Sequence, residues 1–473
     1  MERYDAVVVG AGPNGLTAAT TLADAGRSVL VIERADEIGG GARTMELTVP
    51  GVRHDMCSTA HPMAVLSPYL RTLPLADHGL SWAQPDVPVA HALAPGSAAF
   101  LPRDLEEAVE QLGPDGSAYR SVMGPLVRDW AKLEDSVLGP IPRIPRHPIA
   151  LARFGLHALM PATVAARRFD SEATRALFAG CAAHAFLPLS RPLSASFGWF
   201  LMATAHLANW PVARGGSGTL TTALAAYARS RGVVFETGRE VTSLAELPPR
   251  VLTLLDVTPN QFARLAADDL GPSYLKRATG FVRAPGVFKV DAATEGPIPW
   301  LNPNLRRAGT VHLDGTIEAV NRAETASFRG LHPDRPFILV VQATNFDPTR
   351  APEGMGTVWA YAHVPNGSPR DLTEHILDRI EEHAPGFRNS VRAVHATSPA
   401  GLEDHNPNYL GGDISGGAHT FRQLVFRPFP QRDPYATPLP GVFLCSSSTP
   451  PGAGTHGMCG HLAARSALAW TAN

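Results

Sequence analysis

Short apolar runs separated by helical patterns make up both ends of the chain. Residues 4–9 and 28–32 are compact runs rich in valine and leucine, and apolar residues recur at helical spacing between them. Such runs are typical of strands that are buried on both faces. Near the other end, a strand at residues 441–445 precedes a glycine-rich turn and a helix at residues 458–470. Strands that alternate with helices in this way predict an α/β fold around a parallel sheet.

The pattern of the N-terminal part returns after residue 214. A helix opens at a glycine pair and ends before Gly232. The strands predicted after it are residues 233–236, 240–244 and 251–256. The last of these is expected to be a central strand, since it is almost wholly apolar.

The central part of the chain predicts a second unit. Residues 280–365 are rich in strands and prolines, with apolar runs at 337–342 and 357–363, and helical patterns occupy residues 101–138 and 371–382. A chain of 473 residues is too long for one core. Two domains are therefore expected, one on a parallel sheet and one combining a mixed sheet with helices.

One segment of this second unit is long and uncharged. Residues 192–213 carry no charge over 22 positions, a length that would span a bilayer. Prolines lie near both of its ends, and polar side chains such as His206 and Asn209 interrupt it. This polarity favours a buried helix that lines a pocket over a membrane span.

A second segment is basic. Residues 140–169 contain five arginines and no acidic residue, set among apolar side chains. The main interpretation is a solvated face on an ordinary pair of helices. Peripheral contact with a membrane surface is the alternative.

Composition narrows the class of protein. A formal net charge of −2 gives no general attraction to nucleic acid or anionic membranes, and 18% charged against 44% hydrophobic residues fits a compact enzyme with much apolar interior. The four cysteines lack the spacing of a zinc site or a disulfide framework, so no metal is expected. Reduced cysteines and a strand that begins almost at the N-terminus, leaving no room for a signal peptide, indicate a cytoplasmic protein.

The strongest chemical signal lies between the first two strands. Gly10, Gly12 and Gly15 form a GxGxxG turn, and Glu33 ends the second strand. Gly10 allows the tight turn, Gly12 lets the backbone approach a pyrophosphate, and Gly15 lets helix and strand pack closely. The helix N-terminus favours an anion, and Glu33 would accept hydrogen bonds from a ribose. Strand, turn, helix and acid in this order predict a dinucleotide site.

The residues that follow resemble the FAD-binding extension of this unit in amine oxidases and phytoene-desaturase-like enzymes. In those families a GG pair and an arginine follow the ribose acid and hold the FAD diphosphate. Here the corresponding residues are Arg34, Gly40, Gly41 and Arg43, with Gly41 where the pattern has its first arginine. The resemblance implies FAD as the cofactor.

The C-terminal turn resembles the flavin site of the phytoene-desaturase-like family. There a strand, a glycine turn and a helix contact the pyrimidine and ribityl parts of the flavin, and the helix N-terminus stabilises negative charge on the reduced ring. The resemblance places Ser447, Gly454, Gly457 and Met458 at the flavin, and Val241 at the adenine.

Taken together, the chain resembles the phytoene-desaturase-related FAD oxidoreductases. This group includes carotenoid desaturases and isomerases, retinol saturase and the pyridine nucleotide-disulfide oxidoreductase domain-containing protein 2 type, and Pro13 and Asn14 belong to a PNGL stretch similar to the last branch. The family fold implies an FAD-binding domain from residues 1–70, 212–262 and 435–473. The substrate domain would comprise residues 71–211 and 263–434.

The resemblance leaves the chemistry open between three alternatives. The first is desaturation, saturation or isomerisation of an apolar, polyene or lipid-like substrate by hydride transfer to or from the flavin. The second is oxidation of an amine or amino acid, against which the C-terminal turn has Gly452 and Ala453 where amine oxidases have a tyrosine. The third is a binding or assembly protein with little turnover.

Three side chains are candidates for catalysis. Lys289 resembles the lysine that holds a water beside the flavin in amine oxidases, and His419 and His456 lie in loops where proton transfer could occur. No second GxGxxG unit follows, so no NAD(P)H domain is expected. Electrons would leave to oxygen or a quinone, or return to the product. No protein partner, nucleic acid or oligomeric state is indicated.

Overall fold

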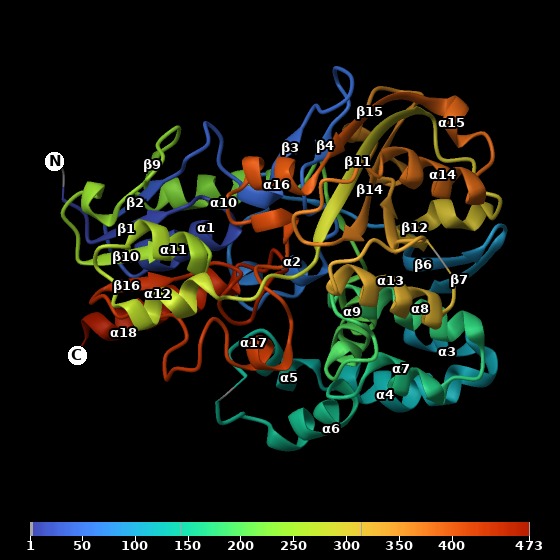
Figure 1. Ribbon diagram of the computed structural model, residues 1–473, viewed down its shortest axis with the longest axis horizontal. Helices are drawn as coiled ribbons and strands as arrows, with labels where there is room; N and C mark the ends of the chain where they lie inside the picture. Colours follow the sequence, from blue (N-terminus) through green and yellow to red (C-terminus); the bar gives the residue numbers. More distant parts are fainter. Residues whose placement is uncertain (1–2, 142, 314, 473) are drawn as a thin grey trace.

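Five short parallel strands form the first sheet of the computed structural model, which describes residues 3–141, 143–313 and 315–472. Figure 1 shows this sheet and its helices on one side of the molecule. The strand order is β16 (Val442–Leu444), β10 (Leu252–Leu255), β1 (Ala6–Val9), β2 (Val29–Ile32) and β9 (Val234–Glu236). Ala6 pairs with both Leu252 and Val29, so β1 is central. The predicted parallel sheet is confirmed.

Helices cover both faces of this sheet because its strands are apolar on both sides. One face carries Ala6 and Val8 and packs against α1 (Pro13–Asp24), α10 (Gly218–Ser230) and α18 (Met458–Thr471). The other face carries Val7 and Val9 and packs against α11 (Pro259–Leu265) and α12 (Pro272–Thr279). Burial of alternate residues against two helical layers explains the continuous apolar runs.

The second sheet has seven strands and is mixed. Its order is β15 (Val391–Thr397), β11 (Gly286–Glu295), β14 (Met355–Val364), β13 (Ile338–Val341), β12 (Ala308–Leu313), β6 (Val87–Ala94) and β7 (Ser97–Leu101). All neighbours are antiparallel except β12 and β6. One face packs on α14 (Thr373–His383), which supplies Ile376 and Ile380 to the core.

A group of helices lies on the other side of the second sheet (Figure 1). These are α3 (Leu105–Gln111), α4 (Gly116–Arg128), α5 (Trp130–Val137), α6 (Pro148–Ala158), α7 (Ala162–Ala165), α8 (Glu172–Ala183), α9 (Ser194–Ala208) and α13 (Ile317–Phe328). Helix α9 contains most of the uncharged segment, and its Trp199 and Met202 are fully buried. The prediction of a buried helix is confirmed.

Shorter elements lie between these helices and strands. They are β3 (Thr44–Met45), β4 (His54–Asp55), α2 (Pro62–Leu66), β5 (Trp82–Ala83), β8 (Val212–Ala213), α15 (Phe387–Ser390), α16 (Pro399–His405) and α17 (Phe421–Val425). No single helix in the described parts of the chain is long and apolar enough to cross a membrane. One bent pair, Pro148–Ala158 with Ala162–Arg168, passes that test together.

The strand predicted at residues 240–244 is wrong. The structure has no strand there and begins a short 3-10 helix at Leu244. Strand β9 therefore forms the edge of the sheet, and residues 240–244 add no further strand to it. Val241 and Leu244 instead pack as side chains in the core beside α11.

Candidate functional site

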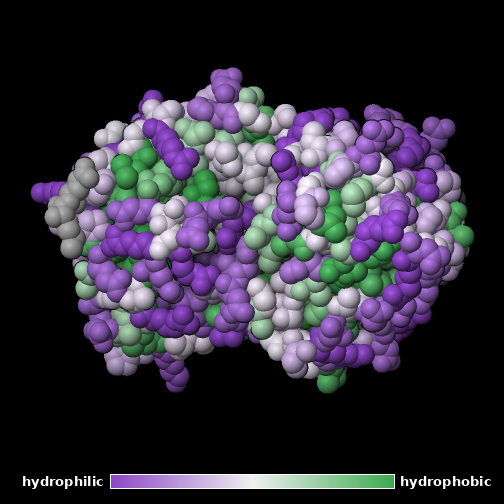
Figure 2. Space-filling model, turned by 90° about the horizontal axis from the view of Figure 1, so that it is seen from above, coloured by the Kyte–Doolittle hydropathy of each residue, from purple (hydrophilic) through white to green (hydrophobic). Residues whose placement is uncertain are grey.

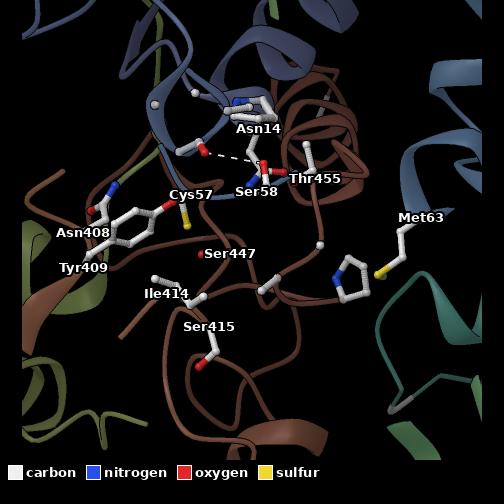
Figure 3. Close-up of a pocket in the computed structure, with 18 of the residues that line it drawn as sticks. Asn14, Cys57, Ser58, Met63, Asn408, Tyr409, Ile414, Ser415, Ser447 and Thr455 are labelled. Atoms are coloured by element: carbon white, nitrogen blue, oxygen red, sulfur yellow. Dashed lines mark hydrogen bonds between the residues drawn. The ribbon is translucent and has the colours of Figure 1, made fainter. Parts of the chain in front are cut away.

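A cavity of about 700 Å³ lies between the first sheet and the second. Figure 3 shows Asn14, Ser58 and Thr455 gathered in it, with Cys57 and Tyr409 beside them. The predicted cofactor residues that line this cavity are Gly10, Gly12, Pro13, Asn14, Glu33, Arg34, Gly40, Gly41, Arg43, Val241, Ser447 and Gly454. The fold therefore brings the N-terminal motif, Val241 and the C-terminal turn to one place.

The glycine turn has the geometry that its sequence predicts. A Cβ on Gly15 would lie 1.9 Å from the carbonyl oxygen of Gly10, so only glycine allows this contact of helix and strand. Gly10 itself has φ +101°, which glycine adopts without strain. Helix α1 begins after Gly12 with no side-chain cap. Pro13 has no N–H, and the Gly15 N–H donates to Asp256 Oδ2 at 2.9 Å. The Asn14 N–H and the helix dipole are left for an anionic diphosphate.

Glu33 is held rigidly at the end of β2. Its Oε2 accepts a hydrogen bond from the Ala11 N–H at 2.7 Å, and its Oε1 accepts one from the Ala35 N–H at 2.9 Å. The carboxylate therefore fixes the glycine turn while its remaining lone pairs face the cavity. This arrangement fits a carboxylate that binds ribose hydroxyls.

Tyr409 explains the glycine that replaces an arginine after the GG pair. A Cβ on Gly41 would lie 1.7 Å from the Tyr409 hydroxyl oxygen, so the tyrosine occupies the space of any side chain there. The remaining arginines are fixed by the C-terminal end of α16. Arg34 donates to the Asp404 carbonyl oxygen at 2.8 Å, and Arg43 donates to the His405 carbonyl oxygen at 3.1 Å.

Asp256 is a site residue that the sequence reasoning missed. It follows β10 and lines the cavity, and its Oδ2 accepts a hydrogen bond from the Gly15 N–H at 2.9 Å. Burial raises the pKa of this carboxyl to about 7. A signal existed, since an acid directly after a central parallel strand lies at the edge where ligands bind.

Met458, Gly457 and His456 do not line the cavity but shape the start of α18. The Met458 N–H donates to His456 Nδ1 at 3.0 Å, so the imidazole caps the helix. The Thr17 hydroxyl donates to the Gly457 carbonyl oxygen at 2.7 Å and ties this turn to α1. Burial lowers the pKa of His456 to about 4, so the ring is neutral. A part for His456 in proton transfer stays a prediction.

His419 does line the cavity. Its Nδ1 lies 2.9 Å from the Ala185 carbonyl oxygen, which fixes a proton on Nδ1 and leaves the lone pair on Nε2. Burial and the nearby Arg427 guanidinium lower the pKa of His419 to about 3, and the Phe197 ring lies against it. A neutral imidazole with a free Nε2 can accept a hydrogen bond or a proton from a bound molecule.

Lys289 is buried on β11 and does not line the cavity. Its ammonium donates to Asp291 on the same face of the strand and lies over the Trp359 ring, 5.9 Å from the centroid. Burial raises the pKa of Asp291 to about 6 even with this partner. The structure thus gives Lys289 an ion pair, and its catalytic role stays a prediction.

Lys289→Met is expected to lower the free energy of unfolding by about 1–3 kcal/mol, because it leaves a buried carboxyl unpaired. The loss should grow as pH rises above 6, since Asp291 must then hold its proton in the fold. Denaturant unfolding at several pH values would measure this loss of stability.

The double variant Lys289→Met/Asp291→Leu is the control, and it should restore most of the lost stability. A similar loss in both variants would contradict the pairing. An unchanged reoxidation rate by oxygen in the double variant would exclude a flavin role for the ammonium.

The far end of the cavity is apolar and uncharged. Helices α5, α6 and α9, strands β12–β14 and residues 414–424 form it, and none of their described lining residues is Asp, Glu, Lys or Arg. Its aromatic and branched side chains include Phe154, Phe186, Phe197, Phe200, Trp210, Leu339, Val341, Trp359 and Tyr361. The charged lining residues all belong to the dinucleotide-binding segments or to Asp256.

Buried histidines lie behind this apolar wall, and the sequence reasoning missed them. His184 lines the cavity, and its Nε2 is 3.2 Å from His312 Nε2. Burial lowers the pKa of His184 to about 3, so one neutral ring donates to the other. His363 pairs with Glu324 at 2.8 Å nearby. These residues come from α8, β12, β14 and α13, and no local pattern connects them.

The remaining chemical groups suggest no further site. All four cysteines are buried and unpaired with one another. Across residues 3–141, 143–313 and 315–472, no group of three or more His, Cys, Asp or Glu side chains could hold a metal ion.

Comparison with known proteins identifies the relatives of this fold. The sequence profile of flavin-containing amine oxidoreductases matches residues 14–465. The chain is 28% identical to the pyridine nucleotide-disulfide oxidoreductase domain-containing protein 2 of Mus musculus, over 98% of this chain and 92% of that protein. It is 38% identical to a limonene dehydrogenase component of Castellaniella defragrans, over 24% of this chain and 20% of that protein.

Solved structures share the fold. The putrescine oxidase structure with bound putrescine superposes with a TM-score of 0.63 at 18% identity, covering 100% of each chain. At this identity the similarity concerns the fold, and it confirms the predicted FAD-binding architecture with a mixed-sheet and helical second part.

Proposed function

We propose that this chain, which belongs to the flavin-containing amine oxidoreductase family, acts on a neutral, apolar substrate of the polyene or lipid-like class. The reaction would be desaturation, saturation or isomerisation. The observation that carries this proposal is the uncharged far end of the cavity, where aromatic and branched side chains replace any carboxylate. Apolar walls of this kind bind apolar molecules by removing their surface from water.

FAD is the cofactor of this family, and the residues of the cavity fit it. The glycine turn and the N-terminus of α1 suit the diphosphate, and Glu33 suits the ribose. Val241 would lie against the adenine, and Ser447 and Gly454 would lie along the flavin. When bound, FAD accepts or returns a hydride.

The chain's own residues would orient the substrate and exclude water. Phe197, Trp359 and Tyr361 narrow the apolar end, where a long molecule would lie along the ring faces. His419 Nε2 could accept a hydrogen bond from the substrate and orient it, since its ring is neutral and its Nδ1 proton is already bonded to Ala185. Exclusion of water strengthens such a hydrogen bond.

Amine oxidation is the second candidate. Trp359 and Tyr361 favour it, since their rings meet edge to face at 5.0 Å in the cavity wall and could contact a cation. Against it, a protonated amine in the apolar end would find no carboxylate, and the neutral His184 and His419 would not compensate its charge. The apolar class is therefore preferred.

The relatives give further support to this choice. One is named for limonene, a neutral hydrocarbon, and the mouse relative extends over nearly the whole chain. Membership of the phytoene-desaturase-related part of the family is a further part of this proposal. Cytoplasmic location, and oxygen or a quinone as electron acceptor, are further parts of the proposal. A binding or assembly role would be indicated if no substrate changed the flavin.

The test is reduction of the bound flavin without oxygen. Phytoene, a polyene too weakly conjugated to absorb in the visible range, is expected to bleach the visible bands of the flavin, while putrescine and other diamines leave them unchanged. A redox-neutral isomerisation would instead convert the polyene with flavin reduced beforehand, measured by chromatography. Bleaching by diamines with no effect of any polyene would establish the amine alternative. No response to either class would favour the binding role.

NADPH is expected to reduce the flavin slowly or not at all, because the sequence has a single dinucleotide-binding motif, which FAD occupies. Stopped-flow absorbance without oxygen would measure the rate. Rapid stoichiometric bleaching by NADPH would overturn this prediction.

A further inference from the structure

Helix α6 is apolar on two opposite sides. Leu151, Phe154 and Ala158 line the cavity, whereas Ile149 and Leu156 are 77% and 70% exposed to solvent. Ile149 and Leu156 are seven residues apart, so they lie on the same outer face of the helix. Large apolar side chains gathered on an exposed face are typical of a surface that contacts a partner or a membrane. Within the described parts of the chain, Ile149 and Leu156 stay largely uncovered.

Other exposed hydrophobic side chains adjoin this helix. Ile144, just before α6, is 95% exposed, and Leu159, just after it, is 56% exposed. In Figure 1 helix α17 lies near α5 and α6, and Phe421 at its start is 58% exposed. By contrast, the face seen from above in Figure 2, away from α6, is mostly polar, with only small hydrophobic groups.

The cavity opens at this apolar surface. Ile141 and Leu159 are both exposed to solvent and part of the cavity lining. Leu424 of α17 lines the same cavity. A molecule that entered between α6 and α17 would thus pass from the exposed hydrophobic surface directly to the apolar end.

Basic side chains surround the surface. Residues 140–169 contain five arginines and no acid. Arg146 and Arg153 pair with Asp135 and Asp129. Among the described residues, the exposed Arg143, directly before Ile144 in the chain, forms no ion pair. An unpaired arginine beside an exposed isoleucine matches the two layers of an anionic membrane surface, its headgroups and its acyl chains.

We propose that α6, with Ile144 and Phe421, docks on the surface of an anionic lipid bilayer and opens the cavity to it. The helix would lie in the plane of the interface without spanning the membrane. Membrane docking itself is independent of the chemistry, and only the passage of substrate from the bilayer rests on the proposed function.

The test uses the FAD-loaded protein and sedimentation with vesicles. Binding is expected to vesicles of phosphatidylcholine with phosphatidylglycerol, and weaker binding to phosphatidylcholine alone. Ile149→Ser/Leu156→Ser should weaken binding about thirtyfold or more, since two large apolar side chains no longer leave water. Leu301→Ser is the matched control, because Leu301 is half-exposed beside α14, on the far side in Figure 1. Flavin absorbance and thermal unfolding would verify that both variants are folded.

Several outcomes would overturn the proposal. They are absence of binding to either vesicle, equal binding with and without anionic lipid, and equal weakening by the control. A dimer in solution that the α6 variant dissociates, without vesicle binding, would show that a second copy covers the surface. Vesicle binding is measured without a substrate. A negative result would therefore contradict membrane docking alone, and the proposed function would still be tested by flavin reduction.

Discussion

Glu33→Ala is expected to release FAD while the protein stays folded. The carboxylate holds the Ala11 and Ala35 N–H groups and presents its free lone pairs to the cavity. Hydrogen bonds to a charged group contribute about 1.5–3 kcal/mol each, so loss of a bidentate contact with the ribose would weaken FAD by about a hundredfold or more. Titration of FAD into apoprotein, followed by flavin fluorescence, would measure the dissociation constant.

A matched variant separates this effect from a general change of charge. Glu37→Ala removes an exposed carboxylate four residues away and should bind FAD as the wild type does. Circular dichroism of Glu33→Ala should keep the helical content. Full flavin occupancy in that variant would exclude Glu33 as the ribose ligand.

The dinucleotide site could be predicted because the residues that form it are close together in the sequence. Gly10, Gly12 and Gly15 fall within one turn, and their roles depend on contacts over a few residues, such as Gly15 against the Gly10 carbonyl. Burial of β1 and β2 on both faces made their continuous apolar runs easy to recognise. The strand predicted at residues 240–244 is absent from the structure. Which strand ends the sheet depends on the arrangement of all its strands, and the residues of one segment do not determine it.

The rest of the site depends on distant residues. Nothing near Gly41 in the sequence indicates that Tyr409 fills its side-chain space. The His184–His312 contact joins α8 to β12. The partner of Lys289 could have been predicted, since Asp291, two residues later, must lie on the same face of the strand.

Asp256 makes stability and FAD binding depend on pH. Burial raises the pKa of its carboxyl from 3.8 to about 7, so the folded state holds the proton more tightly than the unfolded chain does. The contribution of Asp256 to the free energy of unfolding is therefore greatest below pH 4. It falls by about 4 kcal/mol in total as the pH rises to 7. The buried histidines have lowered pKa values and act in the opposite direction, so only a comparison with a variant isolates Asp256.

Asp256→Asn keeps the shape and an oxygen for the Gly15 N–H but cannot ionise. The variant should therefore become more stable relative to the wild type as the pH rises from 4 to 7. Above pH 7 the difference in their free energies of unfolding should stay constant. The diphosphate of FAD would repel an ionised Asp256, so FAD affinity of the wild type should fall above pH 7 while that of the variant stays level. Asp36→Asn, at an exposed carboxylate, should follow the wild type. Parallel pH profiles for the wild type and Asp256→Asn would mean that Asp256 is already ionised in the folded protein. The N-terminus of α1 would then stabilise the negative charge of this carboxylate, and the cofactor diphosphate would have to compete with it.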